Sequence, residues 1–172
     1  MKLFSTLSLL IGAAATTVIA GRQDSKNPDT FYLKTSGAEN SAHNDLYVYG
    51  YHTGAGLNDA VLTPDIETAS RAYLNGTQVL FDYNTTFPWG LSPWGVTNYA
   101  AWQFVQINAG AGQEGFSVNS TGLQWSQQKG FGGWLVCDWW HNAPQLFYLY
   151  RYYNAEYPAS CSEVKLVTEP TA

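Results

Sequence analysis

Short apolar runs separated by Gly, Asn and Pro fill most of the chain, and this pattern predicts an all-β fold. Within the runs, apolar and polar positions alternate as they do in strands that cover a core with one face. Helical periodicity is nearly absent. The predicted strands are residues 31–35, 46–52, 60–62, 72–74, 78–83, 101–107, 115–118, 123–126, 134–139, 145–152 and 163–167.

Two groups of turn residues indicate how these strands pair. Asn75-Gly76 stands between two apolar runs and predicts a tight β-hairpin, because both residues tolerate a positive φ. The segment Asn119 to Gly122 predicts a second, longer hairpin. The connections are too short for crossover helices, so we expect an antiparallel β-sandwich or closed barrel of roughly ten short strands.

The segment 131–150 concentrates aromatic residues around one further expected hairpin. It also contains a cysteine, Cys137, and two polar residues with possible chemistry, Asp138 and His141. Its apolar runs on both sides of the turn predict that it is central to the core.

The ends of the chain predict its domain boundaries. Residues 1–20 combine a basic Lys2, an apolar stretch and small residues at the end, which is typical of a cleaved secretory signal. Residues 21–29 predict a flexible arm, residues 30–168 a single β domain, and residues 169–172 a short tail. A secreted protein, extracellular or associated with a cell wall, is therefore expected. No later run is long enough to span a membrane.

Charge and composition narrow the classes of partner. Lys and Arg number 8 against 13 Asp and Glu, which gives a formal net charge of −5. An acidic and sparsely charged surface argues against a nucleic-acid partner. The 7 Trp, 12 Tyr and 8 Phe are instead typical of packed β-structure or of a surface that stacks on rings.

An oxidising compartment changes the expectation for the two cysteines. Cys137 and Cys161 are the only ones, and they are expected to form a disulfide that stabilises the fold by about 3 kcal/mol. Asn75, Asn84 and Asn119 each begin an Asn-x-Thr sequon, so they are predicted glycosylation sites on the surface.

Candidates for catalysis are few. Asp138 and His141 could share a proton, but their spacing in a strand followed by a bend favours opposite faces. Asp138 is therefore expected to end the strand or to satisfy backbone donors of the bend through Asn142. His43, Asp45 and His52 form a second cluster, yet the chain has no His-x-His or His-Glu-x-x-His spacing, and no metal site is predicted. Serine-elbow and phosphate-loop motifs are absent. No catalytic residue and no cofactor are therefore assigned.

Aromatic residues offer candidates for ligand binding. The segment 87–96 contains Pro-Trp-Gly twice, and its stiff turns could hold Trp89 and Trp94 out as flat plates for a sugar, a sterol or a protein. The alternative is that both rings fold back as a lid over the core. In the run 46–52, alternation places Tyr47, Tyr49 and Tyr51 on one face, which is either core or a platform for sugar rings.

Several longer motifs carry a resemblance. The runs Phe31–Gly37, Leu46–Leu62 and Phe131–Phe147, with the closing Cys161, resemble an uncharacterised family of small secreted fungal (ascomycete) proteins rich in β-structure. A looser pattern, an N-terminal Phe-x-Leu strand and a C-terminal cysteine, is similar to phialide-type cell-wall proteins. The resemblance implies an extracellular, non-enzymatic fungal protein and supplies no catalytic residues.

Three functional hypotheses follow from the sequence. The first is a secreted non-enzymatic β-domain at the fungal cell wall or the host interface, as an effector whose partner is a wall polysaccharide or a host protein. The second is a glycan-binding module that uses the Trp and Tyr residues named above. The third is a small secreted hydrolase that uses Asp138 with His141 or His43.

Overall fold

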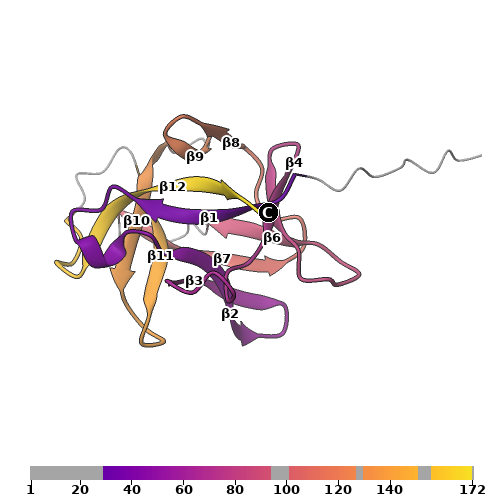
Figure 1. The fold of residues 1–172 in the computed structure, drawn as a ribbon, viewed down its shortest axis with the longest axis horizontal. Helices are drawn as coiled ribbons and strands as arrows, with labels where there is room; N and C mark the ends of the chain where they lie inside the picture. Colours follow the sequence, from indigo (N-terminus) through magenta and orange to yellow (C-terminus); the bar gives the residue numbers. More distant parts are fainter. Residues whose placement is uncertain (1–28, 94–100, 127–129, 151–155, 172) are drawn as a thin grey trace, which may run out of the picture.

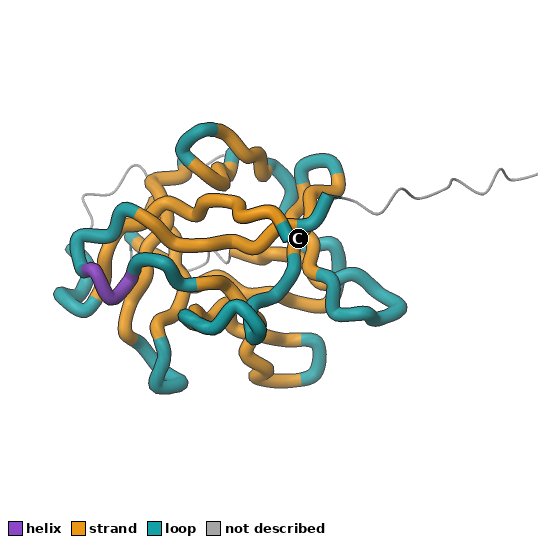
Figure 2. Tube along the Cα trace, viewed as in Figure 1, coloured by secondary structure: helices purple, strands orange, loops and turns teal. Residues whose placement is uncertain are grey.

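The computed structural model describes residues 29–93, 101–126, 130–150 and 156–171. These residues form twelve β-strands and one 3-10 turn, η1 (Ser41–His43), and they contain no α-helix (Figures 1 and 2). The strands are β1 (Phe31–Ser36), β2 (Tyr47–Gly54), β3 (Leu57–Thr63), β4 (Ala72–Asn75), β5 (Gln78–Phe81), β6 (Trp89–Pro93), β7 (Trp102–Ala109), β8 (Phe116–Asn119), β9 (Gly122–Trp125), β10 (Phe131–Asp138), β11 (Pro144–Tyr150) and β12 (Cys161–Pro170).

Nine of the strands close into an antiparallel barrel. Their order around the barrel is β10, β12, β1, β4, β5, β6, β7, β3 and β11, and β11 pairs back to β10. Strand β2 is an addition that pairs along its length with β3 and touches β1 at Lys34 and Tyr47. The predicted all-β antiparallel fold is confirmed, and of the two architectures the closed barrel is the one formed.

The two predicted hairpins are also confirmed. β4 and β5 pair across Asn75 and Gly76, and Gly76 has the expected positive φ of 61°. β8 and β9 form a separate two-stranded sheet, seen at the top of Figure 1. Its buried residues join the core of the barrel, and Trp134 of β10 donates a hydrogen bond from Nε1 to the Leu123 carbonyl at 2.7 Å. This hairpin therefore packs against the barrel as a cover.

The β10–β11 hairpin is buried on both faces, which explains the unbroken apolar runs of residues 131–150. One face joins the main core and the other joins a smaller outer cluster. Residues facing the main core are Trp134, Val136, Leu146, Tyr148 and Tyr150. Residues in the outer cluster are Leu135, Cys137, Phe147, Leu149 and Cys161. The predicted disulfide is confirmed: Cys137 and Cys161 are paired positions of β10 and β12, with Cα atoms 3.9 Å apart.

The described chain begins and ends side by side. Thr30 and Thr171 share hydrogen bonds through their side chains and backbone, and β12 continues to Pro170, two residues beyond the predicted domain end. The predicted signal segment, and the predicted arm up to residue 28, lie outside the described residues. No helix among the described residues is long and apolar enough to cross a membrane.

Candidate functional site

Three strands meet in a fork on one side of the barrel. β7 and β11 pair directly at one end, and β3 separates them at the other. The paired positions that define the fork are Phe104–Phe147 between β7 and β11, Asp59–Gln106 between β3 and β7, and Val61–Gln145 between β3 and β11. Diverging strands leave space on the outer face that side chains must fill or line.

A cleft of about 390 Å³ lies over this fork. Such a volume falls within the range of small-ligand sites. Its aromatic lining residues are Trp102, Phe104, Trp139, Trp140 and Phe147. Its polar lining residues are Asp59, Gln103, Gln106 and Gln145. The cleft therefore has aromatic walls and polar groups supplied by the fork itself.

Three of the aromatic rings hold one another in place. The ring of Trp102 lies edge-to-face with Trp139 at 5.4 Å and with Phe147 at 5.1 Å, and Trp139 and Phe147 are 5.5 Å apart. Trp139 nevertheless remains 50% exposed and its neighbour Trp140 remains 65% exposed. Two adjacent exposed tryptophans are unfavourable in water unless they meet a ligand or a partner.

The turn that carries these tryptophans is anchored by His141. Its Nε2 lies 2.9 Å from Asp59 Oδ2, and its ring stacks on Tyr51 of β2 at 4.1 Å. His141 and Asn142 both have left-handed backbones, with φ of 65° and 53°. Such a conformation costs about 1 kcal/mol or more for a non-glycine residue, so tertiary contacts must hold it. The His141 contacts hold the turn against β2 and β3.

Asp59 is fully engaged by its neighbours. Its Oδ2 meets His141, and its Oδ1 accepts a hydrogen bond from Gln106 Nε2 at 3.1 Å. Gln106 Oε1 in turn accepts from Asn108 Nδ2 at 3.0 Å. Glycoside hydrolysis needs two carboxyl groups, and among the described lining residues Asp59 supplies one.

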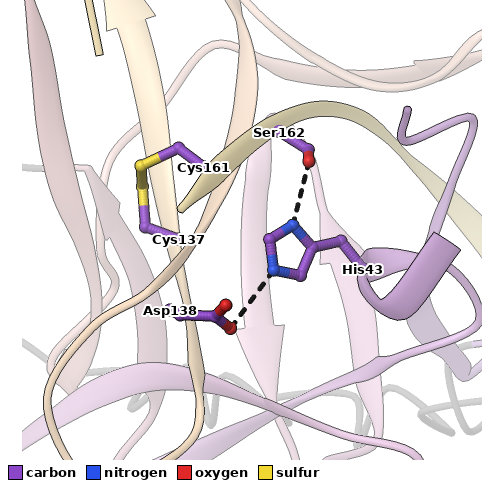
Figure 3. Close-up of a disulfide and its surroundings, with 5 residues drawn as sticks. All are labelled: His43, Cys137, Asp138, Cys161 and Ser162. Atoms are coloured by element: carbon purple, nitrogen blue, oxygen red, sulfur yellow. Dashed lines mark hydrogen bonds and ion pairs between the residues drawn. A yellow bond between two sulfur atoms is a disulfide. The ribbon is translucent and has the colours of Figure 1, made fainter. Parts of the chain in front are cut away.

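A second arrangement brings together a serine, a histidine and an acid beside the disulfide (Figure 3). His43 Nδ1 lies 3.0 Å from Ser162 Oγ, and His43 Nε2 lies 3.2 Å from Asp138 Oδ1. In serine hydrolases the base faces the serine through Nε2 and the acid through Nδ1, so the ring here is reversed. Ser162 is 5% exposed, so its hydroxyl belongs to a buried residue. The arrangement ties η1 to β10 and β12.

The hydrolase hypothesis paired Asp138 with either His141 or His43, and the structure forms only the second of these pairs among the described residues. Asp138 meets His43, whereas His141 meets Asp59, a residue in β3. Asp138 is the last residue of β10, as expected. Asp45, the third member of the predicted histidine cluster, forms an ion pair with Lys34 at 3.2 Å instead.

At Trp89 the structure shows the second of the two expected arrangements, in which the ring folds back against the core. Trp89 begins β6 rather than standing in a loop, it is half-buried against the core, and its Nε1 donates to Thr85 Oγ1 at 3.0 Å. β6 pairs with β5 and β7. Gly90 and Gly112 pass so closely that a Cβ on either would clash with the backbone of the other segment. Trp94 lies outside the described residues.

The tyrosine face of β2 divides into three environments. Tyr47 is buried against Tyr32, and its hydroxyl donates to Glu169 at 3.0 Å. Tyr49 is half-buried, whereas Tyr51 is exposed and stacks on His141 at the cleft. Among the four predicted aromatic binding residues that the structure describes, Tyr51 is therefore the one that contacts the turn lining the cleft.

The profile of one protein family matches residues 28–170, and its description is a domain of unknown function (DUF7907). The chain belongs to the DUF7907 family. No curated protein and no solved structure matches it. The DUF7907 match includes every described strand and all residues that line the cleft, so the cleft is part of the family domain.

Sequence reasoning missed most of the cleft of this DUF7907 domain. Trp102, Trp139 and Trp140 were not among the predicted binding residues. A local signal did exist: Trp139 and Trp140 stand where the predicted strand 134–139 ends, and adjacent residues of an extended segment point to opposite faces. The contribution of Trp102 had no such signal, because it depends on the pairing of β7 with β11.

The three sequon asparagines of the DUF7907 domain lie at turns. Asn75 ends β4, Asn84 follows β5, and Asn119 ends β8, and all three are exposed. Asn75 and Asn84 both line a second cavity of about 390 Å³. Glycans attached there would extend from the hairpins that bear these residues.

Proposed function

We infer that this domain is a secreted, non-enzymatic module that binds a neutral glycan of the cell wall in the cleft over the β3–β7–β11 fork. The observation that carries the proposal is the pair of exposed tryptophans, Trp139 and Trp140, on an anchored turn beside polar side chains. A sugar ring has an apolar face of C–H groups and a rim of hydroxyls. Aromatic walls suit its faces, and amide or carboxylate groups suit its rim.

The charge of the cleft favours a neutral ligand over an anionic one. Asp59 is the charged residue among the described lining residues, and no Lys or Arg lies among them. The formal net charge of −5 would further repel acidic sugars and phosphates. Chitin and β-glucan, both neutral wall polysaccharides, are therefore the first ligands to test.

Export and an extracellular role are supported by the sequence and by two features of the fold. A disulfide joins β10 to β12, as is usual in oxidising compartments, and three sequons lie on exposed turns. The export proposal is checked by N-terminal sequencing of protein recovered from culture medium. A chain starting at residue 21 supports it, and a chain retained in the cell with Met1 intact would overturn it.

Sedimentation with insoluble chitin and β-1,3-glucan tests the binding proposal. We expect the wild type to sediment with at least one polysaccharide and the Trp139→Ala, Trp140→Ala double variant to stay in the supernatant. Phe87→Ala is the matched control, because Phe87 is 47% exposed but does not line this cleft. Failure of the wild type to bind, or equal binding by the double variant, would refute the proposal. Release of soluble sugars would instead favour a hydrolase.

A further inference from the structure

Gln145 is an unusual residue in the cleft, because its side chain is buried and its amide oxygen accepts no hydrogen bond from the described residues. It lies at the start of β11, between Cys137 of β10 and Val61 of β3, and it is 3% exposed. Its Oε1 has no hydrogen-bond partner among the described residues. A buried acceptor left unpaired destabilises a folded protein, and such groups are rare in native structures.

The side chain of Gln145 belongs to the outer face of the barrel. Alternation along β11 places Leu146 and Tyr148 in the main core, so Gln145 and Phe147 project to the opposite face. Both of these outward residues line the cleft. The unpaired amide is therefore part of the wall that a ligand would meet.

Neighbouring polar groups in the cleft differ from Gln145 in being occupied. Both oxygens of Asp59 are engaged, by His141 and by Gln106. Gln106 donates to Asp59 and accepts from Asn108. These bonds hold the turn and the fork together. Gln145 Oε1 is, among the described residues, the buried side-chain oxygen that has no hydrogen-bond partner.

We propose that the Gln145 amide is the specificity-determining group of the cleft and hydrogen-bonds a hydroxyl on the rim of the bound sugar ring. This inference rests on the proposed glycan-binding function. The amide can turn over about its last bond and exchange Oε1 with Nε2, so it can present either an acceptor or a donor to the cleft. A sugar hydroxyl can accept or donate in return, whereas a purely apolar ligand such as a sterol ring would leave the amide unpaired.

The proposal predicts opposite effects on stability and on binding. In Gln145→Met a side chain of similar length replaces the amide, so a buried unpaired acceptor is removed together with the ligand contact. We expect the thermal midpoint to stay equal or rise, and the affinity for the sugar to fall about tenfold, the size expected for one lost hydrogen bond. Gln145→Leu gives an independent second variant with the same expectation.

The test is isothermal titration calorimetry with chitohexaose and laminarihexaose, alongside thermal unfolding of each variant. Gln113→Met is the matched control, since Gln113 is exposed and does not line the cleft. Wild-type affinity in both Gln145 variants would overturn the assignment of Gln145 while leaving glycan binding intact. A lower midpoint in both would also overturn it, because it would show that the amide has a structural partner. Absence of wild-type binding to either sugar would remove the proposed function and this inference together.

Discussion

Two histidine–aspartate pairs stand on either side of the β10–β11 turn, and they differ in what surrounds them. His43 is 1% exposed, and it joins Ser162 to the exposed Asp138 beside the disulfide. His141 meets a mostly buried Asp59 under an exposed aromatic turn. The same pair of residue types thus fixes a 3-10 turn to the barrel in one place and positions a candidate binding surface in the other.

The role of each acid–histidine pair is decided by the residues around it. Asp138 and His141 are three positions apart in sequence, yet their partners come from η1 and from β3. The first pair closes on a buried serine, and the second adjoins a cleft. We therefore expect substitutions at the first pair to affect stability and those at the second to affect binding.

The largest expected effect on stability is at His43. His43→Ala leaves a cavity and removes the partner of a buried hydroxyl, so we expect the free energy of unfolding to fall by about 3 kcal/mol. Urea denaturation measures this loss. Glycan affinity of the folded variant should stay at the wild-type level, and a selective loss of affinity without destabilisation would contradict the structural role.

His141→Ala is expected to lower the glycan affinity more clearly than the stability of the fold. It removes one partly buried hydrogen bond and one stacking contact, which should cost about 1 kcal/mol of unfolding free energy. Glycan affinity should fall by about tenfold, since the turn bearing Trp139 and Trp140 loses its anchor. His52→Ala is the control, because His52 is exposed and outside the cleft lining. Unchanged titration curves for His141→Ala would show that the turn needs no anchor.

The ion pair between Lys34 and Glu169, at 3.1 Å, gives the smallest expected effect. Hydrogen bonds from Lys34 and then from Tyr47 hold the pKa of Glu169 below its ordinary value of 4.5. A carboxyl with a lowered folded-state pKa stabilises the fold above its unfolded pKa, and that contribution is lost as the pH falls through the folded value. The carboxyl is open to solvent, so the contribution is small.

Glu169→Gln should therefore lower the thermal midpoint slightly at pH 7, and the difference from the wild type should vanish as the pH falls below the lowered pKa. Thermal unfolding from pH 7 down to pH 2 measures this, with the exposed Glu67→Gln as the control. If the difference in thermal midpoint between Glu169→Gln and the wild type grew as the pH falls, it would contradict a lowered pKa of Glu169.

Much of the fold could be predicted because its signals are local. The Asn75-Gly76 turn, the hairpin at Asn119–Gly122 and the apolar alternation of most strands are properties of neighbouring residues. The strand at Trp89–Pro93 escaped prediction because Pro and Gly are typical of loops, and it is recognisable only from its pairing with β5 and β7. The choice of a barrel depends on the pairing of β1 with β4, which no local pattern contains.

The candidate site was harder to predict than the fold. Its cleft depends on a fork where β3, β7 and β11 meet, and these strands are far apart along the chain. The anchor between His141 and Asp59 joins two such segments, and the unpaired amide of Gln145 becomes noticeable only when its burial is known. Tyr51 was predicted because strand alternation groups it with Tyr47 and Tyr49 on one face, although the sequence left open whether that face is core or a platform.

Indole N–H signals in an NMR titration with chitohexaose or laminarihexaose test the central claim most directly. We predict that the signals of Trp102, Trp139 and Trp140 shift with saturable curves of a single affinity, because these rings line the cleft. The signal of Trp134, whose indole is buried and bonded to Leu123, should stay in place. A titration that leaves the three cleft signals unmoved while others shift would contradict the claim that the fork is the glycan site.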